Sequence, residues 1–213
     1  MSQRTSGIYK ILNAPFLYEL TQNFFWKKEK RKEFVEGHFK LSEGLRVLDI
    51  GCGTGLLFKA ITESNISVNY VGLDLNLSYI EYATRRYPLA QFFFGDISNL
   101  SHMLREEFDV IVIVNVLHHL DDIQVDKLFY DCKQCLREGG RLLTLDPVRT
   151  QQASLIERFM IEFDRGEHIR DATKYYELAR KSFKRINQHI RTGFLKVPMT
   201  VNILECFINE EVF

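Results

Sequence analysis

Five short apolar runs, separated by stretches of helical character, constrain the fold of this 213-residue chain more than any other feature. They read "RVLDIG", "NYVGLDL", "AQFFFGD", "FDVIVIVN" and "GRLLTLDP", and they lie between positions 46 and 147. Strands that are apolar almost throughout are typical of parallel sheets covered by helices on both faces. The pattern therefore predicts a doubly wound α/β core, in which ligands bind beyond the carboxyl ends of the strands.

The flanking residues are predicted to extend this core rather than to form a second domain. Residues 1–44 predict an N-terminal helical cap, and residues 149–213 predict a helical insert followed by an antiparallel β-hairpin at one edge of the sheet. We therefore expect one domain over residues 1–213, with residues 45–148 as its core. The expected fold is a Rossmann-like, doubly wound, seven-stranded sheet that is mostly parallel, with helices on both faces.

Charge and hydropathy exclude several classes of protein. The chain carries 28 basic and 28 acidic residues, so no overall field attracts it to nucleic acid. No segment offers about 18 uninterrupted apolar residues, and the N-terminus lacks the apolar region of a signal peptide. We expect a soluble, cytoplasmic protein with no membrane span and no nucleic-acid partner.

The four cysteines predict neither a disulfide framework nor a metal site. Cys132 and Cys135 form a C-x-x-C, the spacing of a redox pair or of half a zinc site. They recur at helical spacing with Leu128 and Phe129, however, and no second C-x-x-C and no nearby histidine pair completes four ligands. The pattern favours buried cysteines on one helix face and predicts no metal.

The stretch "VLDIGCGTG", residues 47–55, ends the first apolar run in a glycine-rich turn that lets a ligand approach the backbone. Its glycines follow G-x-G-x-G, whereas a dinucleotide site needs a glycine where Leu56 stands. Asp49 also opposes phosphate, because two like charges about 5 Å apart repel by roughly 3 kcal/mol at an effective dielectric near 20. A G-K-[ST] ending for a nucleoside triphosphate is missing. The turn suits S-adenosylmethionine (SAM), which carries an ammonium and a sulfonium but no phosphate.

Four motifs in the same order, "VLDIGCGTG", "VGLDLN", "FFFGDI" and "FDVIVIVNVLHHL", resemble those of class I SAM-dependent methyltransferases over roughly residues 45–150. The C-terminal stretch is also similar to the tails of small bacterial methyltransferases of unassigned substrate. The resemblance implies SAM as the cofactor and S-adenosylhomocysteine (SAH) as its product. It implies that the following residues bind the cofactor: Asp49, Gly51, Cys52, Gly53, Gly55, Asp74, Leu75, Asp96, Ile97 and Asn115.

Individual roles follow from the same resemblance. Asp74 is expected to accept both ribose hydroxyls, and its alternative is an ordinary residue at a strand end. Asp96 is expected to accept the adenine amino group while the backbone N–H of Ile97 reaches a ring nitrogen. Asp96 capping the next helix is the alternative. Asn115 is expected to line the cofactor beside the sulfonium.

Catalytic candidates lie in "LHHL", directly after the fourth apolar run. His118 and His119 are candidates for a general base, since imidazole titrates near neutral pH, and His119 is preferred over His118. Shaping or packing of the pocket is the alternative for both rings. Further candidates on the substrate side are Tyr18, Asp146 and Arg170, each with a surface charge or polar group as its alternative.

Absent motifs narrow the acceptor. "NVLHH" replaces the N/D-P-P-Y/F of enzymes that methylate exocyclic or amide nitrogens, and no Pro-Cys pair or basic RNA-binding module is present. We expect a small-molecule acceptor methylated at oxygen. Residues 45–148 hold 9 Lys/Arg against 14 Asp/Glu and the flanks hold 19 against 14, which favours an anionic acceptor. One alternative, from another class, is a non-catalytic SAM-binding accessory or regulatory protein on the same fold, and another is a nicotinamide-dependent reductase.

Overall fold

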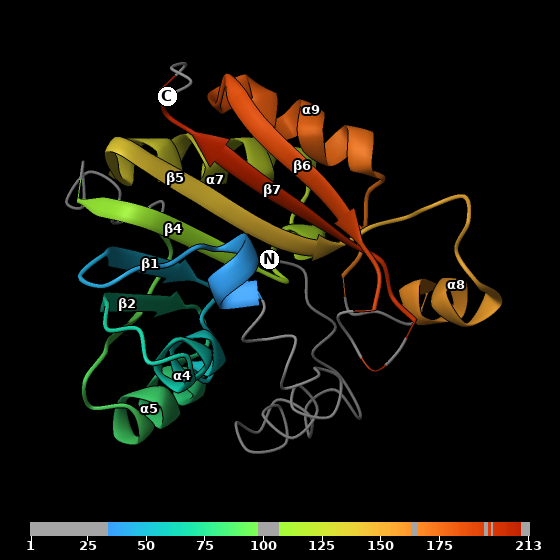
Figure 1. Cartoon of the computed structure of the whole chain (residues 1–213). Coiled ribbons are helices and arrows are strands. Elements are labelled where there is room, and N and C mark those ends of the chain that lie inside the picture. The colour runs from blue at the N-terminus through green and yellow to red at the C-terminus, as the bar shows by residue number, and fades with distance from the viewer. Residues whose placement is uncertain (1–33, 98–106, 163–165, 194–195, 197, 210–213) are drawn as a thin grey trace.

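A computed structural model describes residues 34–97, 107–162, 166–193, 196 and 198–209. These residues form one seven-stranded sheet in the order β3-β2-β1-β4-β5-β7-β6, with helices on both faces (Figure 1). Strands β1 to β5 run parallel, and β7 pairs antiparallel with both β5 and β6. The predicted fold class is confirmed, including the antiparallel hairpin at one edge.

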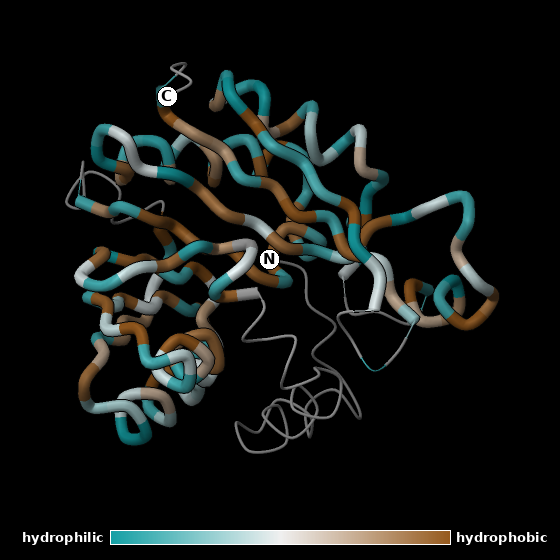
Figure 2. The backbone as a smooth tube through the Cα atoms, viewed as in Figure 1, coloured by the Kyte–Doolittle hydropathy of each residue, from teal (hydrophilic) through white to brown (hydrophobic). Residues whose placement is uncertain are grey.

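The strands become less buried from the centre of the sheet to its edges. Nearly all side chains of the central strands β1 and β4 are buried, whereas the edge strands β3 and β6 are largely open to solvent. Figure 2 shows hydrophobic residues along β4 and β7 and a more hydrophilic β6 at the edge. The strands are β1 (Arg46–Ile50), β2 (Asn69–Asp74), β3 (Gln91–Phe94), β4 (Phe108–Val114), β5 (Leu136–Pro147), β6 (Arg185–Arg191) and β7 (Val201–Phe207).

The helices divide between the two faces. Apolar residues of η1, α4 and α5 join one core cluster, and those of α7 and α9 join the other. Side-chain caps from Asn76, Asp121 and Asp171 start α5, α7 and α9. The described helices are η1 (Phe34–His38), α4 (Leu56–Glu63), α5 (Leu77–Arg86), η2 (Leu117–His119), α7 (Asp122–Cys135), α8 (Leu155–Glu162) and α9 (Ala172–Ser182).

One boundary differs from the prediction. Strand β5 begins at Leu136, four residues before the predicted start at Gly140, because α7 ends at Cys135 and the chain turns directly into the sheet. Leu136 pairs with Phe108, and the register then shifts before Arg141 meets Val110. Residues 98–106, between β3 and β4, and most of the predicted N-terminal cap lie outside the described residues.

The prediction of buried cysteines on one helix face is confirmed. Cys132 and Cys135 are fully buried in the core cluster under α7. Burial raises the pKa of the Cys132 thiol well above its ordinary value, which keeps it protonated and unreactive. Within the part of the chain that the structure describes, no helix has the length and apolar character needed to cross a membrane.

Candidate active site

The turn after β1 is built from three glycines in the left-handed region. Gly51, Gly53 and Gly55 have φ angles of 75°, 55° and 81°, which other residues adopt only with strain. The backbone N–H groups of Gly51 and Cys52 donate to the Leu73 carbonyl oxygen at 2.8 and 3.0 Å, which fastens the turn to β2. A Cβ atom added at Gly51 would lie 2.3 Å from Val116 Cγ2, so the chain just beyond β4 comes close to this turn.

Asp74 ends β2 and orders the same turn. Its Oδ2 accepts a hydrogen bond from the Gly53 N–H at 2.9 Å, and its Oδ1 accepts one from the Asn76 N–H at 2.8 Å. Burial raises the pKa of Asp74, while these two bonds act in the opposite direction. A carboxylate has about four acceptor positions, so Asp74 keeps capacity for ribose hydroxyls. Leu75 follows with 43% of its surface exposed.

Asp49 lies inside the sheet at the end of β1, only 3% exposed. Its Oδ2 accepts a hydrogen bond from the Tyr70 hydroxyl on β2. Burial outweighs this bond and raises the pKa of Asp49 to about 7, and the charge of Asp74 adds to the rise. Asp49 is therefore close to half ionised at neutral pH, and a cation beside it would favour the charged form.

The other predicted cofactor residues lie at neighbouring strand ends. Asp96 follows β3 and is half-buried, and the side chain of Ile97 is buried in the core. Asn115 follows β4 with a left-handed φ of 57°, and its N–H donates to the Leu145 carbonyl oxygen at 2.8 Å. Asparagine tolerates this conformation better than most residues. The helix that Asp96 was expected to cap as an alternative lies outside the described residues.

The structure brings together both histidines and Asp146. They sit on the short η2 turn after β4 and at the end of β5, where Asp146 Oδ1 contacts His118 Nδ1 at 2.7 Å and accepts from the His118 backbone N–H at 3.1 Å. Asp146 is 1% exposed and His118 4%, and the His119 ring lies 4.1 Å from that of His118. Burial raises the pKa of Asp146, and its bonds to His118 oppose that rise.

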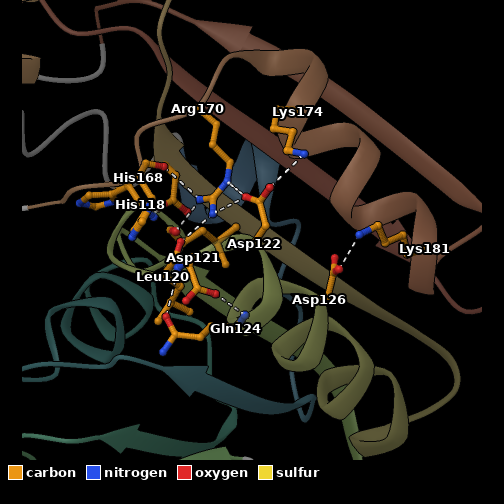
Figure 3. Close-up of polar contacts among 12 residues, drawn as sticks. His118, Leu120, Asp121, Asp122, Gln124, Asp126, His168, Arg170, Lys174 and Lys181 are labelled. Atoms are coloured by element: carbon orange, nitrogen blue, oxygen red, sulfur yellow. Dashed lines mark hydrogen bonds and ion pairs between the residues drawn. The ribbon is translucent and has the colours of Figure 1, made fainter. Parts of the chain in front are cut away.

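Arg170 was predicted to lie on the substrate side, and in the structure its guanidinium binds other groups of the protein. It is 7% exposed, and all five of its N–H groups are engaged by the protein (Figure 3). Nε donates to Asp122 Oδ1, Nη1 to the Leu117 and His168 carbonyl oxygens, and Nη2 to the Leu120 carbonyl oxygen and Asp122 Oδ1, at distances of 2.6 to 3.0 Å. No N–H group of this guanidinium remains for an acceptor. Tyr18 lies outside the described residues.

A polar layer beside Asp146 was not predicted from the sequence. Asn202 on β7 lies directly opposite Asp146, and its Oδ1 accepts from Gln188 Nε2 on β6 at 2.7 Å. Gln188 Nε2 also donates to the Ala172 carbonyl oxygen, and the Tyr175 hydroxyl donates to the Pro147 carbonyl oxygen. This layer depends on the register of the hairpin, as the contact between Tyr70 and Asp49 depends on the packing of β1 against β2.

The polar groups described above are not arranged as metal ligands. Across the described residues, no cluster of three or more His, Cys, Asp or Glu side chains is arranged to hold a metal ion. The site instead combines a glycine turn, the buried Asp49 and the half-buried Asp74 at the ends of β1 and β2, and an imidazole–carboxylate pair at the ends of β4 and β5. Such a site can bind an organic cation and move a proton.

Known proteins share this architecture. Residues 47–140 match the sequence family described as "Methyltransferase domain". The "Ubiquinone biosynthesis O-methyltransferase" of Chelativorans sp. (strain BNC1) is 36% identical over 133 residues, which cover 57% of this chain and 51% of that protein. A solved SAM-dependent methyltransferase from Archaeoglobus fulgidus matches with a TM-score of 0.68 and 17% identity, over 89% of this chain and 99% of that one. The [4+2]-cyclase SpnF matches with a TM-score of 0.70 and 15% identity, over 94% of both chains.

These similarities differ in what they establish. The chain spans about half the length of the first curated relatives it matches. The two solved structures are below 25% identity and show the fold alone. The matched residues contain the glycine turn, Asp49, Asp74 and the histidine turn. Residues 47–140 are therefore similar to a methyltransferase domain, and the described residues share the fold of solved SAM-dependent methyltransferases.

Proposed function

We propose that the chain transfers the methyl group of SAM to a hydroxyl oxygen of a small molecule. The observation that carries this proposal is the close approach of two turns. The glycine turn with its acidic residues and the chain leading into the histidine turn meet where Gly51 faces Val116. A donor bound at the first turn would lie beside the groups of the second. The curated relative that is named as an O-methyltransferase supports oxygen as the acceptor atom.

The residues present fit SAM. The glycine turn presents bare backbone, because Val116 leaves no space for a Cβ atom at Gly51; Asp49 suits the ammonium group, and Asp74 suits the ribose hydroxyls. Leu75 adds an exposed apolar surface beside them. Bound SAM supplies a methyl group already activated by its sulfonium. The protein then has to orient the acceptor in line with that methyl group and to exclude water.

We assign the two histidines different tasks. His118 is buried and held twice by Asp146, so it forms the fixed part of the turn. His119 is more exposed and its ring lies tilted against that of His118, so it is the ring that can meet an acceptor. In this proposal His119 takes the hydroxyl proton as the oxygen attacks the methyl carbon. A base of this kind contributes typically about 10²–10⁴-fold to the rate.

The acceptor is proposed to be small and anionic. The flanks of the core hold 19 basic against 14 acidic residues, whereas the core itself is acidic. Because Arg170 is fully engaged by the protein, other basic groups of the flanks would have to meet the negative charge. A panel of hydroxylated aromatic acids and their uncharged methyl esters tests this preference. Equal turnover of the acids and the esters would contradict an anionic acceptor.

The cofactor site is tested first. Isothermal titration calorimetry with SAM and SAH should give micromolar affinity, and Asp74→Ala should weaken it strongly. Asp126→Ala is the matched control, because Asp126 lies on α7 and pairs with Lys181 away from the glycine turn. Undiminished affinity in Asp74→Ala would overturn the site assignment.

Turnover is tested separately, because a likeness in fold does not fix the reaction. SpnF has this fold and is named as a cyclase. Incubation with methyl-labelled SAM and a metabolite extract should give a labelled product that withstands alkali, as a methyl ether does and a methyl ester does not. Binding of SAM without any labelled product would favour the alternative, a non-catalytic SAM-binding accessory protein.

A further inference from the structure

Arg170 is a buried charge in the segment between α8 and α9. A charged side chain is costly to bury unless hydrogen bonds and opposite charge compensate for lost water. Here three carbonyl oxygens and one carboxylate oxygen surround the guanidinium. The Tyr175 ring packs against it, 5.7 Å from its central carbon. Such complete use of a planar group with five donors is specific to arginine.

The carbonyl groups that Arg170 binds bracket the two histidines. Leu117 and Leu120 lie on either side of His118 and His119, and Nη1 and Nη2 bind their carbonyl oxygens at 2.9 and 2.6 Å. The neighbouring His168 N–H donates to the His118 carbonyl oxygen at 3.0 Å. The segment that ends the insert is therefore fastened directly to the histidine turn (Figure 3).

Asp146 holds the same turn through a different set of groups. It accepts from the backbone N–H and from the ring of His118, whereas Arg170 donates to the flanking carbonyl groups. The turn is thus held by its N–H group on one side and by its carbonyl groups on the other. A positive charge at the carbonyl end of a helical turn is also electrostatically favourable.

Asp122 keeps the guanidinium in place. It begins α7, and its Oδ1 binds both Nε and Nη2 of Arg170 while its Oδ2 binds Lys174 Nζ at 2.9 Å. The bond from Lys174, followed by that from Arg170, lowers the pKa of Asp122, so it stays ionised at neutral pH. Lys174 shares this carboxylate but is half exposed and lies on α9.

We propose that Arg170 is a positioning residue that sets the orientation of the His118–His119 turn toward the acceptor. This inference rests on the proposed function, in which His119 takes the proton. Lysine would preserve the charge, but its single ammonium cannot present two parallel pairs of donors to Leu117, Leu120 and Asp122. The identity of the side chain, and not its charge alone, is therefore expected to matter.

The test compares Arg170→Lys and Arg170→Gln with Lys174→Gln in the full chain. Lys174→Gln removes the other partner of Asp122 without altering the bonds to the turn. We expect both Arg170 variants to shift the side-chain ¹⁵N signals of His118 and His119 in the SAH-bound protein and to lower kcat about 10²-fold, as misplaced catalytic groups do. SAM affinity should change less than about threefold, and Lys174→Gln should leave all three quantities unchanged.

Other outcomes separate the two proposals. Unchanged histidine signals in both Arg170 variants would overturn the positioning role, as would a loss of SAM affinity that matches the loss of kcat. Should Arg170→Gln not fold, partial recovery of kcat in Arg170→Ala by added guanidinium supports the role, and no recovery opposes it. A wild-type chain that binds SAM but labels no acceptor would contradict the proposed function, and the histidine signals would still decide the role of Arg170.

Discussion

At the scale of single residues, the ionisation of Asp49 is expected to link cofactor binding to pH. Its pKa is raised to about 7 by burial, with Tyr70, Asp74 and Cys52 as the neighbouring ionisable groups. Only the ionised carboxylate attracts the SAM ammonium, so SAM affinity should fall by up to about tenfold per pH unit below pH 7 and level off above it. Calorimetry between about pH 5.5 and 8 measures this profile. A flat profile would remove Asp49 from the ammonium site.

Tyr70 is expected to set the midpoint of that profile. Its hydroxyl donates to Asp49 and favours the charged form, so Tyr70→Phe should raise the pKa of Asp49 further. The midpoint for SAM binding should then move to higher pH, and affinity at pH 7 should fall. Tyr130→Phe, at an exposed position on α7, is the control. An unchanged midpoint in Tyr70→Phe would show that the hydroxyl does not tune Asp49.

The same shift affects the stability of the ligand-free chain. The folded pKa of Asp49 lies above its ordinary value of 3.8, so the folded state holds this proton more tightly than the unfolded state does. The contribution of this group to the free energy of unfolding therefore declines as pH rises from about 4 to 7. A neutral side chain at position 49 should therefore make the ligand-free fold more stable at neutral pH than Asp49 does.

Gly51→Ala tests the close approach of the two turns. Alanine at Gly51 is strained by the φ of 75° and also clashes with Val116 at 2.3 Å, whereas Gly44 has a φ of 79° with open space around it. Gly44→Ala should cost about 1 kcal/mol for the backbone alone, and Gly51→Ala should cost clearly more and abolish SAM binding. Chemical denaturation measures both changes. If both substitutions lowered the free energy of unfolding equally, the Val116 side chain would have to move aside without measurable loss of stability.

At the scale of elements, substitutions of the two histidines in the η2 turn, between β4 and α7, should affect different quantities: one catalysis and the other stability. We expect His119→Asn to lower kcat by about 10²–10⁴-fold with little change in SAM affinity, because the base is lost while the turn remains. His118→Asn removes the ring from a buried carboxylate and should lower the free energy of unfolding by about 1–3 kcal/mol. Steady-state kinetics and denaturation together test this division. A kcat that survives His119→Asn would leave that ring a role in shaping the pocket.

Strands and helices whose apolar residues follow one repeat, that of a strand or that of a helix, could be predicted from the sequence. Contacts between these elements could not. The first four strands were predicted to within one or two residues, since each apolar run is bounded by glycine or polar residues. Leu136 satisfies both the helical period of α7 and burial in β5, so its position was ambiguous from the sequence. The pairing of Asp146 with Asn202 depends on the register of a distant hairpin, and the environment of Arg170 depends on how the insert returns to the turn. Periodicity carries no information on either.

At the scale of the whole molecule, the sheet joins the half that carries the glycine turn to the half that carries the histidine turn. Strands β1 to β3 with α4 and α5 carry the glycine turn and Asp74, whereas β4 to β7 with α7 to α9 carry the histidine turn and its supports. Strand β1 pairs with β4, and Gly51 approaches Val116 just beyond β4, so the two halves meet near the site. A ligand bound at the glycine turn should therefore stabilise the whole fold rather than one loop.

Thermal unfolding with SAH and with NADH tests this expectation against the dinucleotide alternative. A ligand at 100 times its Kd adds about 2.7 kcal/mol to the free energy of unfolding, so saturating SAH should raise Tm by several degrees. NADH should have no effect, because Asp49 repels its pyrophosphate and Leu56 replaces the third glycine of a dinucleotide turn. Asp74→Ala should cancel most of the SAH effect while Asp126→Ala preserves it. Stabilisation by NADH without stabilisation by SAH would instead assign the glycine turn to a nicotinamide cofactor.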